Sequence, residues 1–83
     1  MNAIIRQLIA THAGLPIPIH SLPDEADLYR AGMKSFASVE LMLGLEDAFG
    51  IEFPDELLTR ATFRSIAAIQ RAVENLTRGA IAA

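Results

Sequence analysis

The sequence predicts an all-α fold, a bundle of three longer helices and one short helix. Several segments place apolar residues at spacings of three and four, the period of one helix face. No segment shows a clear alternation of apolar and polar residues, which would be typical of a half-buried strand. Proline and glycine separate the segments, which is where the helices are expected to end. The predicted elements are, in chain order, helices over about residues 2–13, 35–49, 55–59 and 63–77, with a long loop over 14–34 between the first two.

The first helix has a candidate N-cap in Asn2 and a candidate end at Gly14. Its expected buried face is formed by Ile5, Leu8, Ile9 and His12. We expect His12 to be a packing or helix-end residue. His12 and His20 have no neighbouring carboxylates at metal-ligand spacing, so no metal site is predicted.

The loop that follows cannot be regular helix in its first half, because it contains Pro16, Pro18 and Pro23. A structureless stretch of this length is unusual in a small domain. We therefore expect apolar side chains to hold it on the core, namely Ile17, Ile19, Leu22 and Leu28.

The helix over 35–49 has two apolar stripes. Ser35 is its candidate N-cap. One stripe is the expected core face, formed by Ser38, Leu41, Met42, Leu45, Ala48 and Phe49. The second stripe, Phe36, Val39 and Leu43, lies on another face and is flanked by acids. It indicates either a docking surface or a helix that is buried on more than one side, and periodicity alone leaves both open. Gly44 within this helix costs about 1 kcal/mol relative to Ala, and the sequence offers no reason for it.

Two further helices are predicted after the break at residues 50–54. Pro54 followed by two acids favours the first turn of a short helix. Thr62 is the candidate N-cap of the last helix, and Gly79 is its candidate C′ residue. The buried stripe of that helix is expected to comprise Phe63, Ile66, Ile69, Val73 and Leu76.

Composition limits the class of protein. Eighty-three residues, 52% of them apolar, predict one globular domain spanning 1–83. The absence of cysteine excludes disulfides, zinc thiolate sites and thiol nucleophiles. Residues 24–56 carry nine acids against two bases, which favours a partner with a basic surface. The four arginines after residue 56 indicate a solvated helix face, not a nucleic-acid site.

Neither a targeting segment nor a catalytic constellation is recognisable. The start lacks the basic and long apolar regions of a signal peptide, and no apolar run approaches the length of a membrane span. A cytoplasmic protein without membrane contact is therefore expected. There is no Ser/His/Asp arrangement with supporting context and no phosphate-cradling glycine loop, so no enzyme activity and no catalytic residue is predicted.

One motif does point to a function. Residues 27–36 read Asp-Leu-Tyr-Arg-Ala-Gly-Met-Lys-Ser-Phe, and Val-Glu-Leu follows at 39–41. Phe-Gly-Ile-Glu at 49–52 and Pro-Asp-Glu at 54–56 complete the pattern. A lone serine at a helix start would be only a cap, but together these blocks resemble an acyl carrier protein. The resemblance extends over nearly the whole chain, and it is strongest over 27–56.

The resemblance implies a four-helix bundle with 4′-phosphopantetheine on Ser35. A phosphopantetheinyl transferase would attach the arm from coenzyme A, and the arm would supply the thiol that this chain lacks. Cargo would be held as a thioester and presented to partner enzymes, without catalysis by the carrier. Family members present the second long helix to partners, which implies a docking role for Lys34, Phe36, Val39, Glu40 and Leu43.

The chain departs from carriers of fatty-acid synthesis, which usually read Asp-Ser-Leu around the serine. Here Lys34 and Phe36 flank Ser35, and Ala37 and Ala48 stand where acids are common. The run over 28–43 is similar instead to the stand-alone aminoacyl carrier proteins of rhizobia and their relatives. This implies an amino acid cargo, glycine or alanine. A ligase resembling the catalytic core of a seryl-tRNA synthetase would load it with ATP.

Two alternatives stay open, a carrier for fatty-acyl or polyketide cargo and an unmodified helical interaction module. The amino acid itself is not written in a carrier, because the ligase selects it. We expect a small polar aminoacyl group to stay outside the bundle, since burying it yields little hydrophobic stabilisation.

Overall fold

Four α-helices and two short 3₁₀ helices make up the fold over residues 1–78, the part of the chain that the computed structural model describes. The helices are α1 (Asn2–His12), α2 (Leu28–Ala31), α3 (Ser35–Phe49) and α4 (Ile66–Thr77). The 3₁₀ helices are η1 (Ile19–Ser21) and η2 (Asp55–Leu57). Residues 1–78 contain no strand, and three of the four α-helices are long, so the predicted fold class is confirmed.

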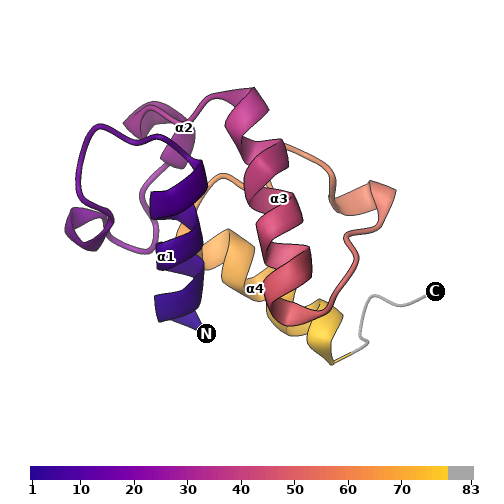
Figure 1. The fold of residues 1–83 in the computed structure, drawn as a ribbon. Coiled ribbons are helices and arrows are strands. Elements are labelled where there is room, and N and C mark those ends of the chain that lie inside the picture. Colours follow the sequence, from indigo (N-terminus) through magenta and orange to yellow (C-terminus); the bar gives the residue numbers. More distant parts are fainter. Residues whose placement is uncertain (79–83) are drawn as a thin grey trace.

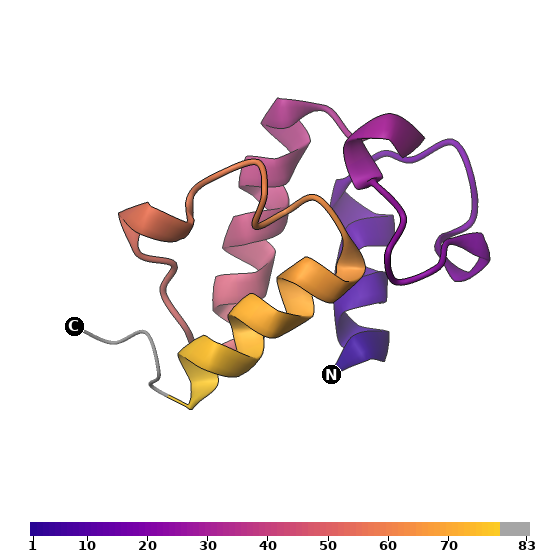
Figure 2. The same ribbon diagram turned by 180° about the vertical axis from the view of Figure 1, so that it is seen from behind.

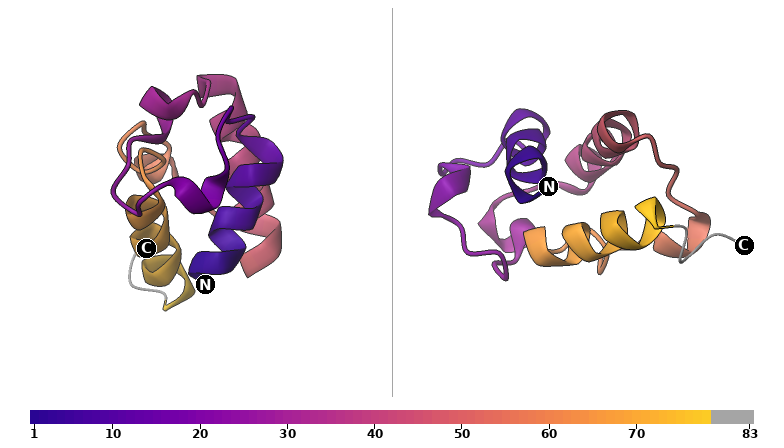
Figure 3. Two further views of the ribbon diagram at one scale, coloured as in Figure 1. Left: turned by 90° about the vertical axis from the view of Figure 1, so that its left-hand side faces the viewer. Right: turned by 90° about the horizontal axis from the view of Figure 1, so that it is seen from below.

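The long helices form two layers. α1 and α3 lie side by side and run in opposite directions, and α4 crosses behind them (Figures 1 and 2). Seen from below, α1 and α3 share one layer and α4 forms the other (Figure 3). Among the described residues every buried side chain is apolar. The core comprises Ile5, Ile9, Ala13, Leu22, Leu28, Met33, Leu41, Leu45, Phe53, Phe63, Ile66, Ile69, Ala72 and Val73.

α1 has the predicted apolar face but not the predicted cap. Met1, not Asn2, occupies the N-cap position, and no side chain caps the helix. The Asn2 amide group instead donates hydrogen bonds to Asp24 and Gln70, and its oxygen accepts one from Arg6 Nε at 2.8 Å. Asn2 therefore joins the start of α1 to the long loop and to α4.

The long loop is more ordered than predicted, because polar contacts shape it as well as apolar ones. Arg6 Nη1 donates to the carbonyl oxygens of Ile19 and Leu22 at 2.8 Å each, and the guanidinium also pairs with Asp24. Leu22 and Leu28 are buried and Ile19 is partly buried, as expected. The expectation for Ile17 is wrong, since its side chain is exposed.

A short helix, α2, stands within this loop and leads to α3. Asp27 caps α2, because its carboxylate accepts hydrogen bonds from the backbone N–H groups of Tyr29 and Arg30. The Leu28 N–H donates to the carbonyl oxygen of Arg64 at 2.7 Å, which ties the helix to the segment before α4. The short α-helix of the bundle is thus at 28–31, and the predicted helix at 55–59 is only a 3₁₀ turn.

α3 begins and ends where the sequence predicts. Its N-cap is Lys34, however, so the prediction of Ser35 as a cap is wrong, and no side chain caps this end. At the other end Gly50 adopts a left-handed conformation (φ 63°), which a residue with a side chain rarely adopts. Leu41 and Leu45 are fully buried, whereas Ala48 is exposed and is not part of the core.

α4 starts later than predicted. Its N-cap is Ser65, whose hydroxyl oxygen accepts a hydrogen bond from the Ala68 N–H at 3.0 Å. Thr62 shares a turn with Thr59 instead, so the predicted cap is wrong by three residues. The predicted stripe is correct, since Ile66, Ile69 and Val73 are fully buried. The predicted C′ residue, Gly79, lies outside the described residues. No helix within residues 1–78 has the length and apolar character needed to cross a bilayer.

Candidate functional site

Ser35 lies in the first turn of α3, where the chain leaves α2 and enters the helix. Its side chain is exposed and makes no capping hydrogen bond. Its carbonyl oxygen accepts a hydrogen bond from Ser38 Oγ at 2.6 Å. The start of a helix leaves backbone N–H groups unpaired and favours negative charge. An exposed hydroxyl that is not used as a cap, at this end of a helix, fits a phosphate ester.

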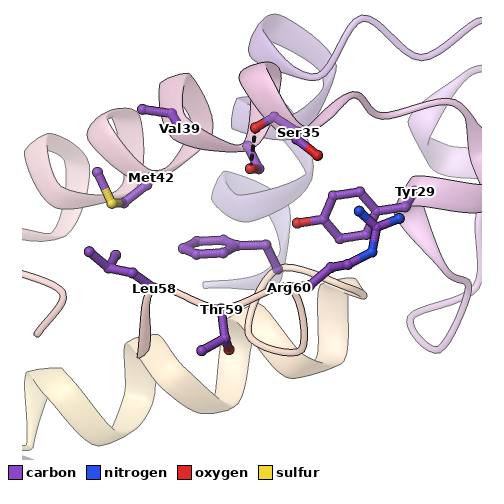
Figure 4. Close-up of a pocket in the computed structure, with 9 residues that line it drawn as sticks. Tyr29, Ser35, Val39, Met42, Leu58, Thr59 and Arg60 are labelled. Carbon is purple, nitrogen blue, oxygen red and sulfur yellow. Dashed lines mark hydrogen bonds between the residues drawn. The ribbon is translucent and has the colours of Figure 1, made fainter. Parts of the chain in front are cut away.

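A cavity of about 370 Å³ opens beside Ser35, between α3 and the segment that follows η2 (Figure 4). It is lined by Tyr29, Ser35, Ser38, Val39, Met42, Leu58, Thr59, Arg60 and Phe63. Ser35, Tyr29 and Arg60 lie at one end, and Val39, Met42 and Leu58 lie toward the other (Figure 4). The cavity therefore has a polar end at Ser35 and is mainly apolar toward Val39, Met42 and Leu58.

The second apolar stripe of α3 is exposed. Phe36, Val39 and Leu43 are 76%, 50% and 55% exposed, although all three are large apolar residues. The alternative of a helix buried on more than one side is therefore wrong for this face. Lys34 and Glu40, the other two predicted docking residues, are exposed as well. All five are therefore exposed, and they extend from the residue before Ser35 into the third turn of α3.

Two carboxylates outside the cavity stabilise the long loop and α2. Burial raises the pKa of Asp27, but hydrogen bonds from the Arg30 N–H, from Arg64 and from the Tyr29 N–H outweigh it and lower the pKa overall. The hydrogen bond from Arg6 lowers the pKa of Asp24, and Asn2 adds to this effect. Two of the acids in the acidic central segment thus serve the fold. Within residues 1–78 no group of three metal-ligating side chains occurs.

Several cavity residues were not predicted from the sequence. Tyr29 lies in the loop that was expected to be irregular, and Leu58, Thr59 and Arg60 follow a 3₁₀ turn. None of these segments has a helical period, so no periodic pattern could bring them together. The family pattern over 27–56 offered a signal for Tyr29 but none for Leu58, Thr59 or Arg60.

Comparison with known proteins identifies the family. Residues 3–70 match the family model described as "Phosphopantetheine attachment site". The chain belongs to this family of carrier proteins. Its covalent cofactor is therefore phosphopantetheine, which supplies a thiol that can hold cargo as a thioester. The resemblance drawn from the sequence is confirmed at the level of the family.

The relatives of this carrier indicate which type of carrier protein it resembles. It is 55% identical, over the full length of both chains, to an aminoacyl carrier protein of Agrobacterium fabrum. It also matches a chain in a crystal structure of an engineered Bradyrhizobium japonicum glycine:[carrier protein] ligase complexed with carrier protein from Agrobacterium tumefaciens and AMP. That match has 58% identity and a TM-score of 0.87, and it covers 89% of this carrier and 99% of the other chain. A solution structure of an A. tumefaciens protein matches over the full length of both chains with 55% identity and a TM-score of 0.76. The carrier is thus a homologue of an aminoacyl carrier protein.

Proposed function

We propose that this carrier holds an amino acid, glycine or alanine, as a thioester on a phosphopantetheine arm attached to Ser35. The observation that carries the proposal is the state of Ser35 itself. Its hydroxyl is exposed at the start of α3, is not used as a cap, and lies beside an exposed apolar stripe. The names of the relatives, an aminoacyl carrier protein and a carrier bound to a glycine ligase, support an amino acid cargo.

The residues around Ser35 have distinct tasks in this proposal. Ser35 Oγ forms the ester bond to the arm phosphate, and the N-terminal turn of α3 stabilises the negative charge of that phosphate. Phe36, Val39 and Leu43 provide apolar contact area for partner enzymes, and Lys34 and Glu40 flank it with charges. No residue of the chain performs catalysis.

The proposed partners act in sequence on this surface. A phosphopantetheinyl transferase attaches the arm from coenzyme A and releases adenosine 3′,5′-bisphosphate. A ligase resembling the catalytic core of a seryl-tRNA synthetase then activates the amino acid with ATP to an aminoacyl adenylate, with release of pyrophosphate. Attack of the arm thiol on the adenylate forms the thioester and releases AMP. A downstream acceptor enzyme removes the cargo. We place these steps in the cytoplasm, without nucleic acid or membrane.

Intact-mass measurement after co-expression with a phosphopantetheinyl transferase tests the attachment site. The wild-type carrier and Ser38→Ala should gain the mass of one phosphopantetheinyl group, whereas Ser35→Ala should gain none. Ser38→Ala is a matched control, because it removes another serine hydroxyl of α3 that also lines the cavity. A mass gain that persists in Ser35→Ala would refute the assignment. No gain in the wild type would favour the unmodified interaction module.

Loading of the modified carrier tests the cargo. Glycine or alanine should be attached in the presence of ATP and a ligase of this type, and hydroxylamine should release it as expected for a thioester. Malonyl and fatty acyl groups, offered with their own acyltransferases, should be attached poorly. Efficient acylation together with no aminoacylation would favour the fatty-acyl or polyketide carrier instead.

A further inference from the structure

Arg60 is the cation at the polar end of the cavity. Its guanidinium carbon lies 3.9 Å from the centroid of the Tyr29 ring, so the two side chains stack. Over residues 1–78 the salt bridges join Arg6 to Asp24 and Arg64 to Asp27, and neither uses Arg60. Arg60 is also the one charged residue among those that line the cavity in the described part of the chain.

The stacking leaves Arg60 able to bind an anion. A guanidinium that lies on an aromatic ring has one face covered, while the N–H groups at its edge stay free. Those N–H groups form a planar fork that matches two oxygens of a phosphate. The ring also restricts the side chain, so less rotamer freedom is lost when the anion binds. Arg60 is therefore prepared for a phosphate, and no carboxylate of residues 1–78 is paired with it.

Ser35 and this cation line the same end of the same cavity (Figure 4). We propose that Arg60, held against Tyr29, is a positioning residue that binds the phosphodiester joining the arm to Ser35. The inference rests on the proposed function, since it requires the arm on Ser35. It adds that the root of the arm is fixed on the cavity side of α3 and does not swing freely about the serine.

Lys34 is the competing cation, because it directly precedes Ser35 and is exposed. Its side chain does not line the cavity, and no aromatic ring of residues 1–78 stacks on it. An ammonium on a flexible stem is strongly hydrated and loses more rotamer freedom when it is fixed. Arg60 is therefore the cation that we expect to determine the direction of the arm.

Solution NMR of the phosphopantetheinylated carrier tests this inference. The samples are the wild type, Arg60→Gln, Arg60→Lys and the control Arg71→Gln, which removes the same charge from an exposed position on α4. Intact mass first establishes that each sample carries the arm. The readouts are the Arg60 Nε–Hε resonance before and after modification, and the NOEs between the Tyr29 ring and the arm methylene next to the phosphate.

We expect the Arg60 Nε–Hε resonance to shift on modification of the wild type and of Arg71→Gln. The NOEs to Tyr29 should be present in both, weaker in Arg60→Lys and absent in Arg60→Gln. Arg60 is exposed, so these variants should keep the amide spectrum of the folded protein. Modified wild type without the resonance shift, or NOEs that are unchanged in Arg60→Gln, would overturn the inference but leave Ser35 as the attachment site. Absence of the mass gain would overturn both proposals.

Discussion

The two faces of α3 both carry large apolar residues, but only one of these faces is buried. Leu41 and Leu45 on one face are fully buried between α3 and the other long helices. Phe36, Val39 and Leu43 on the other face are half or more exposed. Apolar periodicity thus identifies the faces of a helix but does not say what covers each of them. One face holds this domain together, and the other is available to a partner.

The layering explains why only one face is covered. α1 lies beside α3 in the same layer and α4 crosses behind both, and no element of residues 1–78 crosses the outer side of α3 (Figures 1 and 3). Large apolar side chains grouped on an exposed face mark interaction sites in soluble proteins. The exposed face of α3 also begins next to Ser35, so a partner that docks there would lie close to the proposed attachment site.

Truncation of one leucine on each face of α3 should have the largest difference in effect on stability. Leu41→Ala removes a fully buried side chain and should lower the free energy of unfolding by about 2–5 kcal/mol. Leu43→Ala removes a side chain that is 55% exposed and should change it by less than about 0.5 kcal/mol. Urea unfolding followed by circular dichroism measures both. Similar losses in the two variants would mean that the outer face also holds the fold together.

The next prediction concerns binding instead of stability. Phe36→Ala should reduce kcat/KM for loading by the ligase about tenfold or more, because a large exposed aromatic side chain is a typical binding hot spot. Its thermal unfolding should be nearly unchanged. Ile4→Ala is the matched control, since Ile4 is also exposed but lies on α1. Equal loading of Phe36→Ala and the wild type would show that the outer face of α3 does not contact the ligase.

The helical period predicts some elements of this fold correctly and misses others. The bounds of α3 and the buried residues of α1 and α4 were predictable, because their apolar residues follow a helical period over eight or more residues. The start of α4 was not, because Thr62 and Ser65 are both suitable caps and only the structure distinguishes them. α2 was missed because a single helical turn is too short for a periodic pattern. It depends on a cap, Asp27, that is itself held by Arg64.

The sequence likewise predicts one part of the candidate site and not the other. Ser35 and the outer stripe were predictable from local sequence and from the family pattern. The cavity beside Ser35 was not, because it combines residues from α2, α3 and the segment after η2. Contacts between segments far apart in the chain leave no trace in the spacing of residues.

Gly44 also had no explanation until the neighbouring helix was placed. An added Cβ would lie 3.0 Å from His12 Nε2 and 3.4 Å from Leu8 Cδ2, so the glycine lets α1 and α3 approach closely. Gly44→Ala should change stability by less than about 1 kcal/mol, because the gain in helix propensity offsets displacement of the His12 ring. Gly44→Leu should destabilise by about 1–3 kcal/mol through overpacking.

A double substitution tests whether the His12 ring is the reason for glycine at position 44. In a His12→Ala background, Gly44→Ala should become stabilising by about 1 kcal/mol, since the ring that it contacts is gone. Urea unfolding of the four proteins of the cycle measures the coupling between the two positions. Additive effects of the two substitutions would show that the His12 contact does not determine the need for glycine.

The smallest expected effect is a pH dependence that leaves both faces of α3 unaffected. Asp24 and Asp27 have pKa values below their ordinary value of 3.8, so the folded state holds their charged forms more strongly than the unfolded state. The stability they contribute is fully present above pH 3.8 and is lost as the pH falls through the lower folded pKa values. Asp27→Asn should therefore flatten the loss of stability below about pH 4 relative to the wild type. Hydrogen exchange at pH 3, measured relative to the intrinsic exchange rates at that pH, should show reduced protection of the amides in the loop and α2. The amides of α3 near Leu41 and Leu45 should stay protected. Loss of protection at Leu41 and Leu45 at the same pH would show that the loop contacts and the buried face of α3 unfold as one unit.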